Sequence, residues 1–173
     1  MQYKFKKGIT DSQLDQLVEY SKSDPVILKF TSDHIRFKDK TSAMKWISSV
    51  DVYTLTEKAG NLVGITWFHK KLLPSDRDFT IKLDPTDFPI TFAIRIYGEA
   101  RGKGLSEDFM KKSFEKFFSR PRRSRALDLR GLNVWIETSF DNIPTIKLAE
   151  KFGFVKASNP DQRRKIIMIR TQL

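Results

Sequence analysis

The segment from Tyr97 to Ser106, Tyr-Gly-Glu-Ala-Arg-Gly-Lys-Gly-Leu-Ser, constrains the fold of this chain more than any other. It follows an apolar alternating run, Thr91 to Tyr97, which predicts a strand, and it precedes a run with helical spacing, Leu105 to Ser119. Glycines let the backbone turn tightly and approach a ligand, and N–H groups at a helix N-terminus point at anions. The sequence therefore predicts a strand, a tight turn and a helix that together bind phosphate groups.

The composition predicts one globular domain with anionic partners. The 173 residues fit a single domain with its own core, so we expect one domain over residues 1–173. The formal net charge of +11 favours a phosphorylated cofactor, nucleic acid or an acidic surface. The absence of cysteine excludes a disulfide scaffold, a thiolate nucleophile and a Cys-based zinc site. Because His34 and His69 show no metal-ligand spacing either, we expect no metal.

Two observations bear on the cellular location. The N-terminal residues lack the apolar core of a signal peptide. No apolar run approaches the ~20 residues of a membrane span. We therefore expect no membrane span and a cytoplasmic location.

The apolar pattern predicts strands and helices along the whole chain. The strands are expected at 3–7, 52–58, 62–70, 91–97, 133–138, 154–157 and 164–170, with a short one at 79–83. The helices are expected at 10–23, from 41, at 105–119 and at 142–152. The strands at 91–97 and 133–138 flank a helical crossover, which predicts that they pair in parallel. The fold class is thus α/β (α+β): a mixed, mostly antiparallel sheet of about six to seven strands, with a central parallel pair and helices on both faces.

A second motif lies downstream, from Asn142 to Phe154, with the form N-x-x-x-x-x-L-x-E-K-x-G-F. Together with the segment from Arg101 to Ser106, it resembles the GNAT superfamily of acyl-CoA-dependent N-acyltransferases. The phosphate motif of that family is Arg/Gln-x-x-Gly-x-Gly/Ala, and this chain departs from it only at Ser106. The element order resembles the family over nearly the whole chain, and the motifs cover about residues 92–154. Neither a Walker A loop nor a Gly-x-Gly-x-x-Gly dinucleotide fingerprint occurs.

The resemblance implies that acetyl-CoA is the co-substrate. Its pyrophosphate would bind the backbone N–H groups of Gly102 to Ser106, and its pantetheine arm would pair with the strand from Ala93 to Tyr97. An amine would attack the thioester, and the backbone N–H of Ile96 would stabilise the oxyanion. No protein nucleophile is needed. The residues assigned to acetyl-CoA are Ala93, Ile94, Arg95, Ile96, Tyr97, Arg101, Gly102, Lys103, Gly104, Leu105, Ser106, Asn142, Thr145, Leu148 and Lys151.

The general acid is the point where this chain departs most from the family. Many members carry Tyr directly after the Leu of the second motif, and this chain has Ala149 there. The hydroxyl of Ser139 or Thr145, or a water molecule, could protonate the leaving thiolate instead.

The general base stays open between several carboxylates. An alkylammonium pKa near 10.4 means that the amine must lose a proton before it attacks. Glu137, at the end of one predicted strand, and Glu99, just after another, are candidates that would act through a water molecule. Asp76 and Asp78 in the long connection are further candidates.

The acceptor is an unidentified small-molecule or peptide amine, and two other functions stay open. A coenzyme A-binding regulatory protein with little turnover would fit Ala149. An RNA- or ribosome-associated protein would fit the charge of +11 and the arginine-rich run from Arg120 to Arg130. That run could instead bind the 3′-phosphate of coenzyme A or be a solvated loop, and a homodimer is a further alternative.

Overall fold

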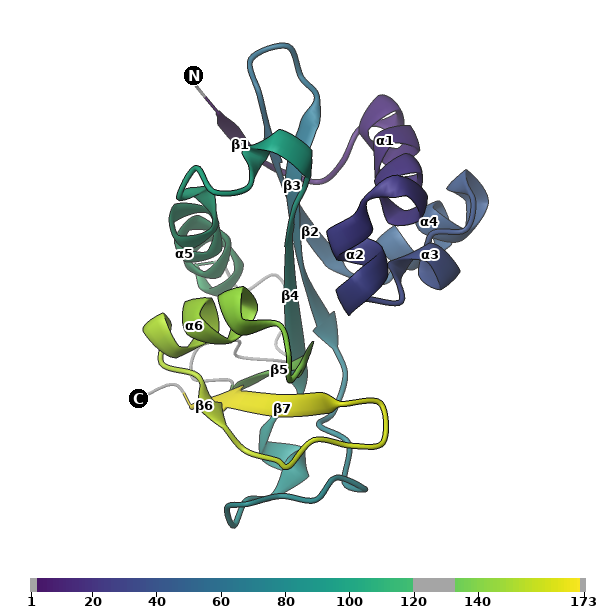
Figure 1. Ribbon diagram of the computed structural model, residues 1–173. Coiled ribbons are helices and arrows are strands. Elements are labelled where there is room, and N and C mark those ends of the chain that lie inside the picture. Colours follow the sequence, from purple (N-terminus) through teal and green to yellow (C-terminus); the bar gives the residue numbers. More distant parts are fainter. Residues whose placement is uncertain (1–2, 120–132, 172–173) are drawn as a thin grey trace. The chain divides into compact units, whose positions relative to one another are not determined.

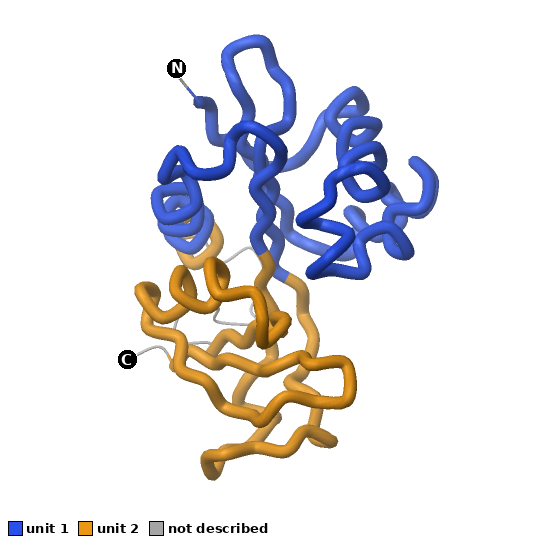
Figure 2. The backbone as a smooth tube through the Cα atoms, in the orientation of Figure 1, with its two compact units in different colours: residues 1–68, 94–115 blue, residues 69–93, 116–173 orange. Residues whose placement is uncertain are grey.

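The computed structural model describes residues 3–119 and 133–171 (Figure 1). The chain divides into two compact units (Figure 2). The first unit comprises Met1–Phe68 and Ile94–Glu115, and the second comprises His69–Ala93 and Lys116–Leu173. That both units belong to one domain of residues 1–173 stays a prediction.

In the described residues, seven strands form one mixed sheet in the order β1-β2-β3-β4-β5-β7-β6. They are β1 (Lys4–Lys7), β2 (Asp51–Thr56), β3 (Leu62–Lys70), β4 (Ile90–Ile96), β5 (Val134–Ser139), β6 (Val155–Lys156) and β7 (Lys165–Arg170). β4 and β5 pair in parallel, with Ile90 opposite Val134 and Thr91 opposite Trp135. The pairs β1–β2, β2–β3, β5–β7 and β6–β7 are antiparallel. The predicted mixed sheet with a central parallel pair is confirmed.

Four helices lie between β1 and β2, where the sequence predicted two. They are α1 (Asp11–Ser23), α2 (Pro25–Phe30), α3 (Asp33–Arg36) and α4 (Lys40–Ile47). α1 ends at Ser23, where the helix predicted at 10–23 also ends. The Asp24-Pro25 dipeptide that follows begins α2, because Asp24 caps Val26 and Ile27 and Pro25 occupies the first turn. The prediction was wrong here because the same dipeptide serves as a stop signal and a start signal.

Helices cover both faces of the strands of the first unit (Figure 1). α1 to α4 lie on one face, and α5 (Leu105–Phe118) lies on the other. A Cβ on Gly64 of β3 would lie 3.2 Å from the Phe109 ring of α5, so β3 and α5 pack closely. Trp67 and Phe68 of β3 are 4% and 2% exposed, so both belong to the core.

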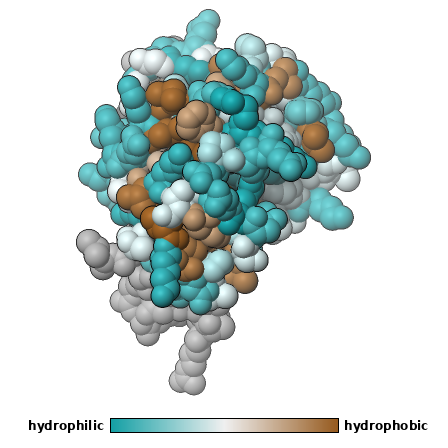
Figure 3. Space-filling model, turned by 60° about the horizontal axis from the view of Figure 1, so that its bottom comes forward, coloured by the Kyte–Doolittle hydropathy of each residue, from teal (hydrophilic) through white to brown (hydrophobic). Residues whose placement is uncertain are grey.

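The exposed apolar side chains of the first unit lie on its short helices: Val26 and Leu28 of α2, Ile35 of α3 and Met44 of α4. Figure 3 shows one face of the molecule, where hydrophilic surface predominates and apolar residues occur in separate groups. Single exposed apolar residues are normal on soluble proteins, so these positions indicate no particular partner.

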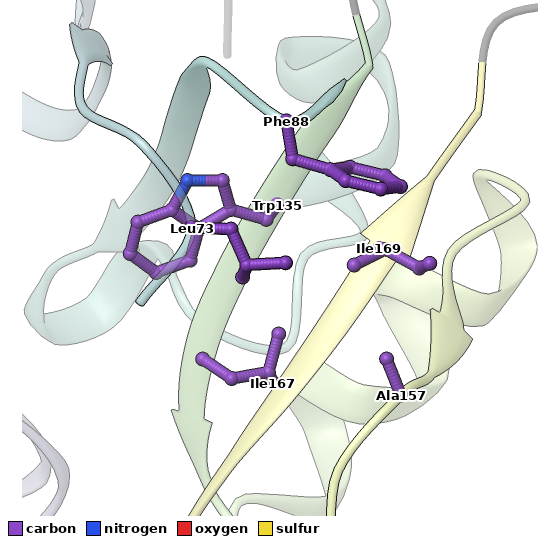
Figure 4. Packing of buried hydrophobic residues seen from close by; sticks show 6 residues of the cluster. All are labelled: Leu73, Phe88, Trp135, Ala157, Ile167 and Ile169. Carbon is purple, nitrogen blue, oxygen red and sulfur yellow. The ribbon is translucent and has the colours of Figure 1, made fainter. Parts of the chain in front are cut away.

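The second unit has its own apolar core between β5, β7 and the long connection that follows β3 (Figure 4). The cluster contains Leu73, Phe88, Trp135, Ala157, Ile167 and Ile169. The Trp135 indole N–H donates to the Lys71 carbonyl at 2.9 Å and ties the connection to β5. The connection also includes a short 3-10 helix, η1 (Pro85–Asp87), and the unit is completed by α6 (Ile143–Lys151).

The strand predicted at 79–83 does not form. Phe79 makes an isolated bridge to Ser158, and Phe79 and Leu83 pack against the core of the second unit. Ile81, which lies between them, is 41% exposed. Apolar alternation here reflects two side chains that point inward from an irregular segment, and not a hydrogen-bonded ladder.

Candidate functional site

The glycine turn joins β4 to α5 through a short 3-10 helix, η2 (Gly98–Ala100). Gly102 and Gly104 have positive φ values of 75° and 72°, which favour glycine. A Cβ placed on either residue would meet no atom within 4 Å, so the turn faces open space. The first N–H groups of a helix have no intrahelical acceptor and carry partial positive charge. The turn and the start of α5 at Leu105 therefore fit an anionic group.

The Asp24 carboxylate holds the glycine turn against α2. Its Oδ2 accepts hydrogen bonds from the Arg101 Nη2 at 2.5 Å and from the Gly98 N–H at 3.3 Å. Its Oδ1 accepts from the N–H groups of Val26 and Ile27 at 3.0 and 3.2 Å. Arg101, the first residue of the predicted phosphate motif, is therefore engaged by a residue 77 positions away, a contact that sequence reasoning missed.

Hydrogen bonding controls the ionisation of Asp24. Burial alone would raise the pKa of its carboxyl group, but hydrogen bonds from Arg101, Ile27 and Gly98 outweigh burial and lower that pKa below its ordinary value. The carboxylate is thus charged at neutral pH, and it holds the turn in place with an ion pair.

The backbone of β4 offers hydrogen-bonding groups beyond its ladder with β5. That ladder covers Ile90 and Thr91, and β4 continues to Ile96. The N–H of Tyr97 donates to the Val63 carbonyl of β3 at 2.9 Å. Since successive residues of a strand direct their backbone groups to opposite edges, the N–H of Ile96 points away from β3. This is the orientation that the predicted oxyanion donor needs.

An ion-pair cluster of Asp33, Arg36 and Arg95 lies on the face of β4 that α1 to α4 cover. Arg95 donates from Nε to Asp33 at 2.8 Å and from Nη2 at 3.3 Å, and its guanidinium lies 4.8 Å from the centre of the Trp67 ring. Arg36 donates to the same carboxylate at 2.8 Å. Burial would raise the pKa of Asp33, but the charge and hydrogen bonds of Arg95 and the charge of Arg36 lower it.

Tyr97 lies beside this cluster with a buried hydroxyl group. Its ring stacks on Tyr20 of α1, with the ring centres 4.7 Å apart. The hydroxyl has no hydrogen-bond partner in the described part of the chain. Burial, followed by the charge of Asp33, raises its pKa well above the ordinary value, so the group is protonated. Neither Tyr97 nor Asp33 was singled out from the sequence for its side chain.

The two candidate bases lie in different units and different surroundings. Glu137 of β5 accepts a hydrogen bond from Arg77, which lies 60 positions away in the sequence. The same arginine also forms an ion pair with Asp161. Glu99 lies in η2, beside the glycine turn, and is exposed. Both side chains are exposed, but Glu137 also anchors the connection that contains Arg77. Of the further candidates, Asp78 accepts a hydrogen bond from the Asn159 side chain at 2.8 Å.

The second motif forms α6 in the second unit. Asn142 caps the helix by accepting from the Thr145 N–H at 3.4 Å. Ala149 is fully buried, and Ser139 of β5 is 9% exposed. Of the other residues assigned to the cofactor, Leu148 is half-buried and Lys151 is exposed. The basic run from Arg120 to Arg130 lies outside the described residues.

Residues 3–119 and 133–171 contain neither a candidate metal site nor a candidate membrane span. No group of three or more His, Cys, Asp or Glu side chains there is placed to hold a metal ion. No helix in these ranges is both long enough and apolar enough to cross a bilayer.

Comparison with known proteins shows where this architecture occurs. No family model and no curated protein matches the sequence. An N-acetyltransferase from Staphylococcus aureus superposes with a TM-score of 0.67 at 14% identity, over 99% of both chains. A GNAT-family acetyltransferase from Streptococcus agalactiae superposes with a TM-score of 0.64 at 13% identity, over 99% of this chain and 96% of the other. The chain has the fold of the GNAT acetyltransferases.

A third structure with this fold contains a ligand. An aminoglycoside acetyltransferase in complex with coenzyme A and kanamycin superposes with a TM-score of 0.66 at 16% identity, over 99% of this chain and 95% of the other. Identities in this range establish the fold and leave the acceptor open. The fold that the resemblance implied is confirmed.

Proposed function

We propose that this protein is an N-acetyltransferase that moves an acetyl group from acetyl-CoA to an amine. The observation that supports this proposal most strongly is the arrangement of the end of β4 (residues 94–96), the glycine turn and the start of α5, all of which lie in the first unit. The turn faces open space at a helix N-terminus, and β4 presents backbone groups beyond its ladder. The GNAT fold, which acetyltransferases of known structure share, supports the same proposal.

The first unit would bind coenzyme A through its backbone. The N–H groups of the turn from Gly102 to Ser106 donate to pyrophosphate oxygens, and the exposed Lys103 adds positive charge. The pantetheine arm pairs with the edge of β4 that carries the N–H groups of Ile94 and Ile96. The α6 residues Asn142, Thr145, Leu148 and Lys151 are assigned to the same cofactor from their motif alone.

The reaction is direct attack of an uncharged amine on the thioester carbonyl. A carbon–nitrogen bond forms, the carbon–sulfur bond breaks, and coenzyme A leaves as a thiolate that takes up a proton. The N–H of Ile96 donates to the oxyanion. We assign proton removal to Glu99, acting through a water molecule, because it lies three residues after Ile96, the proposed oxyanion donor, and because Glu137 is bound to Arg77.

The absence of an acid at Ala149 slows this reaction but does not prevent it. A positioned general acid contributes about 10²–10⁴-fold to a rate. A thiol pKa near 8.5 makes thiolate an adequate leaving group at neutral pH. Water, or the hydroxyl of Ser139 or Thr145, supplies the proton. If turnover proves negligible, the buried Ala149 favours the second candidate, a coenzyme A-binding regulatory protein.

The substitution Gly104→Glu tests the site. A carboxylate in the turn repels pyrophosphate and fills the open space, so we expect coenzyme A binding, measured by calorimetry, to be lost. Gly60→Glu is the matched control, because Gly60 also has a positive φ, of 97°, and open space around its Cβ position, in the β2–β3 turn. It should keep the affinity of the parent protein. If Gly104→Glu bound coenzyme A with unchanged affinity, the assignment of the glycine turn as the coenzyme A site would be wrong.

A further inference from the structure

The face of β4 that carries Arg95 and Tyr97 holds hydrogen-bonding capacity that the described residues do not use. Side chains two residues apart in a strand point to the same face, and both reach the helices of the first unit. Arg95 donates to Asp33 from Nε and Nη2 and to the Ile94 carbonyl from Nη1. An arginine has five N–H donors, so two of them find no acceptor among the described residues. The Tyr97 hydroxyl finds none there either.

Neighbouring side chains hold the Arg95 guanidinium and the Tyr97 hydroxyl in place. Asp33 is 1% exposed and binds the edge of the Arg95 guanidinium, while the Trp67 ring lies against that group. The Arg95 side chain is 18% exposed, so part of it reaches solvent. Tyr97 is 3% exposed, and burial keeps its hydroxyl protonated and able to donate. A buried hydroxyl without a protein partner destabilises a folded protein, so we expect this group to bind a water molecule or a ligand group.

We propose that Arg95 and Tyr97 bind a carboxylate of the acceptor, so that the acceptor is an amine that also bears a carboxylate, as an amino acid does. This inference rests on the proposed acetyl transfer. A guanidinium with two free N–H groups matches the two oxygens of a carboxylate, and the hydroxyl adds a third donor. Ile96, the proposed oxyanion donor, lies between the two residues in the chain, so a carboxylate held there keeps the amine close to the thioester.

A polycationic acceptor fits this face less well. Guanidinium groups only donate hydrogen bonds, and the protonated Tyr97 hydroxyl is a donor as well. The buried Asp33 carboxylate already accepts from Arg36 and Arg95. An ammonium group would therefore meet positive charge without a free acidic partner in this cluster.

The test compares L-amino acids with their own carboxamides as acceptors. Thiol release from acetyl-CoA is measured for each pair, and the carboxamide keeps the amine and side chain but loses the charge. We expect kcat/KM for the best acid to exceed that of its carboxamide by about ten- to hundred-fold, the usual effect of hydrogen bonds to a charged group. The amine of a carboxamide is less basic and more often uncharged, so intrinsic reactivity works against this result.

Two variants test whether the preference for acids over carboxamides comes from Arg95 and Tyr97. Arg95→Gln should bring the ratio of acid to carboxamide close to one, but it also removes a partner of the buried Asp33. Tyr97→Phe removes only an unpaired hydroxyl, so we expect an unchanged or higher Tm and an acceptor KM raised about ten-fold, with the KM for acetyl-CoA unchanged. Arg163→Gln is the charge control, because Arg163 is exposed on the β6–β7 loop of the second unit. This variant should keep the parent's ratio of kcat/KM for the acid to kcat/KM for the carboxamide.

Three results would count against the proposal. Equal or faster reaction of carboxamides overturns the inference and leaves acetyl transfer standing. A Tyr97→Phe variant with unchanged acceptor KM shows that the hydroxyl binds no acceptor and overturns its role. No thiol release with any amine, although acetyl-CoA binds, overturns acetyl transfer itself and the inference with it.

Discussion

Asp24 connects the candidate cofactor site to the helices of the first unit. Its carboxylate binds the N–H groups of α2, the N–H of Gly98 and the guanidinium of Arg101. Asparagine can still cap α2, so Asp24→Asn removes mainly the ion pair. We expect the free energy of unfolding near neutral pH to fall by about 1–3 kcal/mol and coenzyme A affinity to fall with it, because the turn loses its anchor.

The pH dependence of Asp24→Asn follows from the lowered pKa of Asp24. The contribution of this carboxylate to stability is complete above its unfolded pKa of about 3.9 and is lost as pH falls through the lower folded pKa. In urea denaturation, the difference between parent and variant should be constant above about pH 5 and should shrink below about pH 4. Asp39→Asn, at the exposed cap of α4, is the control and should leave coenzyme A affinity unchanged. A difference that grows in acid would contradict this assignment.

Glu99 and Glu137 should respond differently to the same substitution. Glu99→Gln removes the proposed base, so we expect kcat to fall about 10²-fold or more, with the KM for acetyl-CoA unchanged. Glu137→Gln weakens the contact with Arg77, so we expect a lower Tm and a kcat close to that of the parent. Steady-state kinetics and thermal unfolding measure both. A loss of kcat confined to Glu137→Gln would move the base to β5.

The close approach of β3 to β4 explains a glycine that no turn requires. A Cβ on Gly64 would lie 3.0 Å from the Ile96 Cδ1 and 3.1 Å from the Arg95 carbonyl oxygen. Gly64→Ala should therefore displace β4 where the proposed oxyanion donor lies. We expect a loss of about 1–3 kcal/mol in unfolding free energy and weaker coenzyme A binding. Gly60→Ala, which meets no neighbour, should keep that affinity. Unchanged affinity in Gly64→Ala would show that β4 tolerates the added methyl group.

Elements with strong local signals could be predicted from the sequence. The strand, glycine turn and helix around Gly102 were predicted because residues close together in the chain form them, and the parallel pairing followed from the crossover. α2 was missed because Pro25 also marks the end of α1. The strand predicted at 79–83 was wrong because alternation alone does not supply a partner strand.

The site could be predicted only where its residues are neighbours in the chain. The turn from Gly102 to Ser106 is one continuous segment. The pairs Arg101–Asp24 and Arg95–Asp33 join residues 77 and 62 positions apart, and only the folded chain brings them together. The proposed acceptor site depends on such a distant pair, which is why the sequence indicated the cofactor and left the acceptor open.

The charge of +11 does not by itself select among the functions considered. Anionic acetyl-CoA and nucleic acid would both be attracted, and the arginine-rich run from Arg120 to Arg130 lies outside the described residues. The architecture is more informative, because the GNAT fold extends over nearly the whole chain in the structures compared. Nucleic-acid binding and dimerisation stay predictions.

Transfer of an acetyl group is the claim on which the rest depends. The most direct measurement incubates the protein with acetyl-CoA and amines that do or do not bear a carboxylate, and records released thiol together with acetylated amine by mass spectrometry. We predict one thiol released for each amine acetylated, with both products lost in Gly104→Glu and retained in Gly60→Glu. Tight binding of acetyl-CoA without acetylation of any amine would contradict the enzyme assignment and favour a coenzyme A-binding regulatory protein.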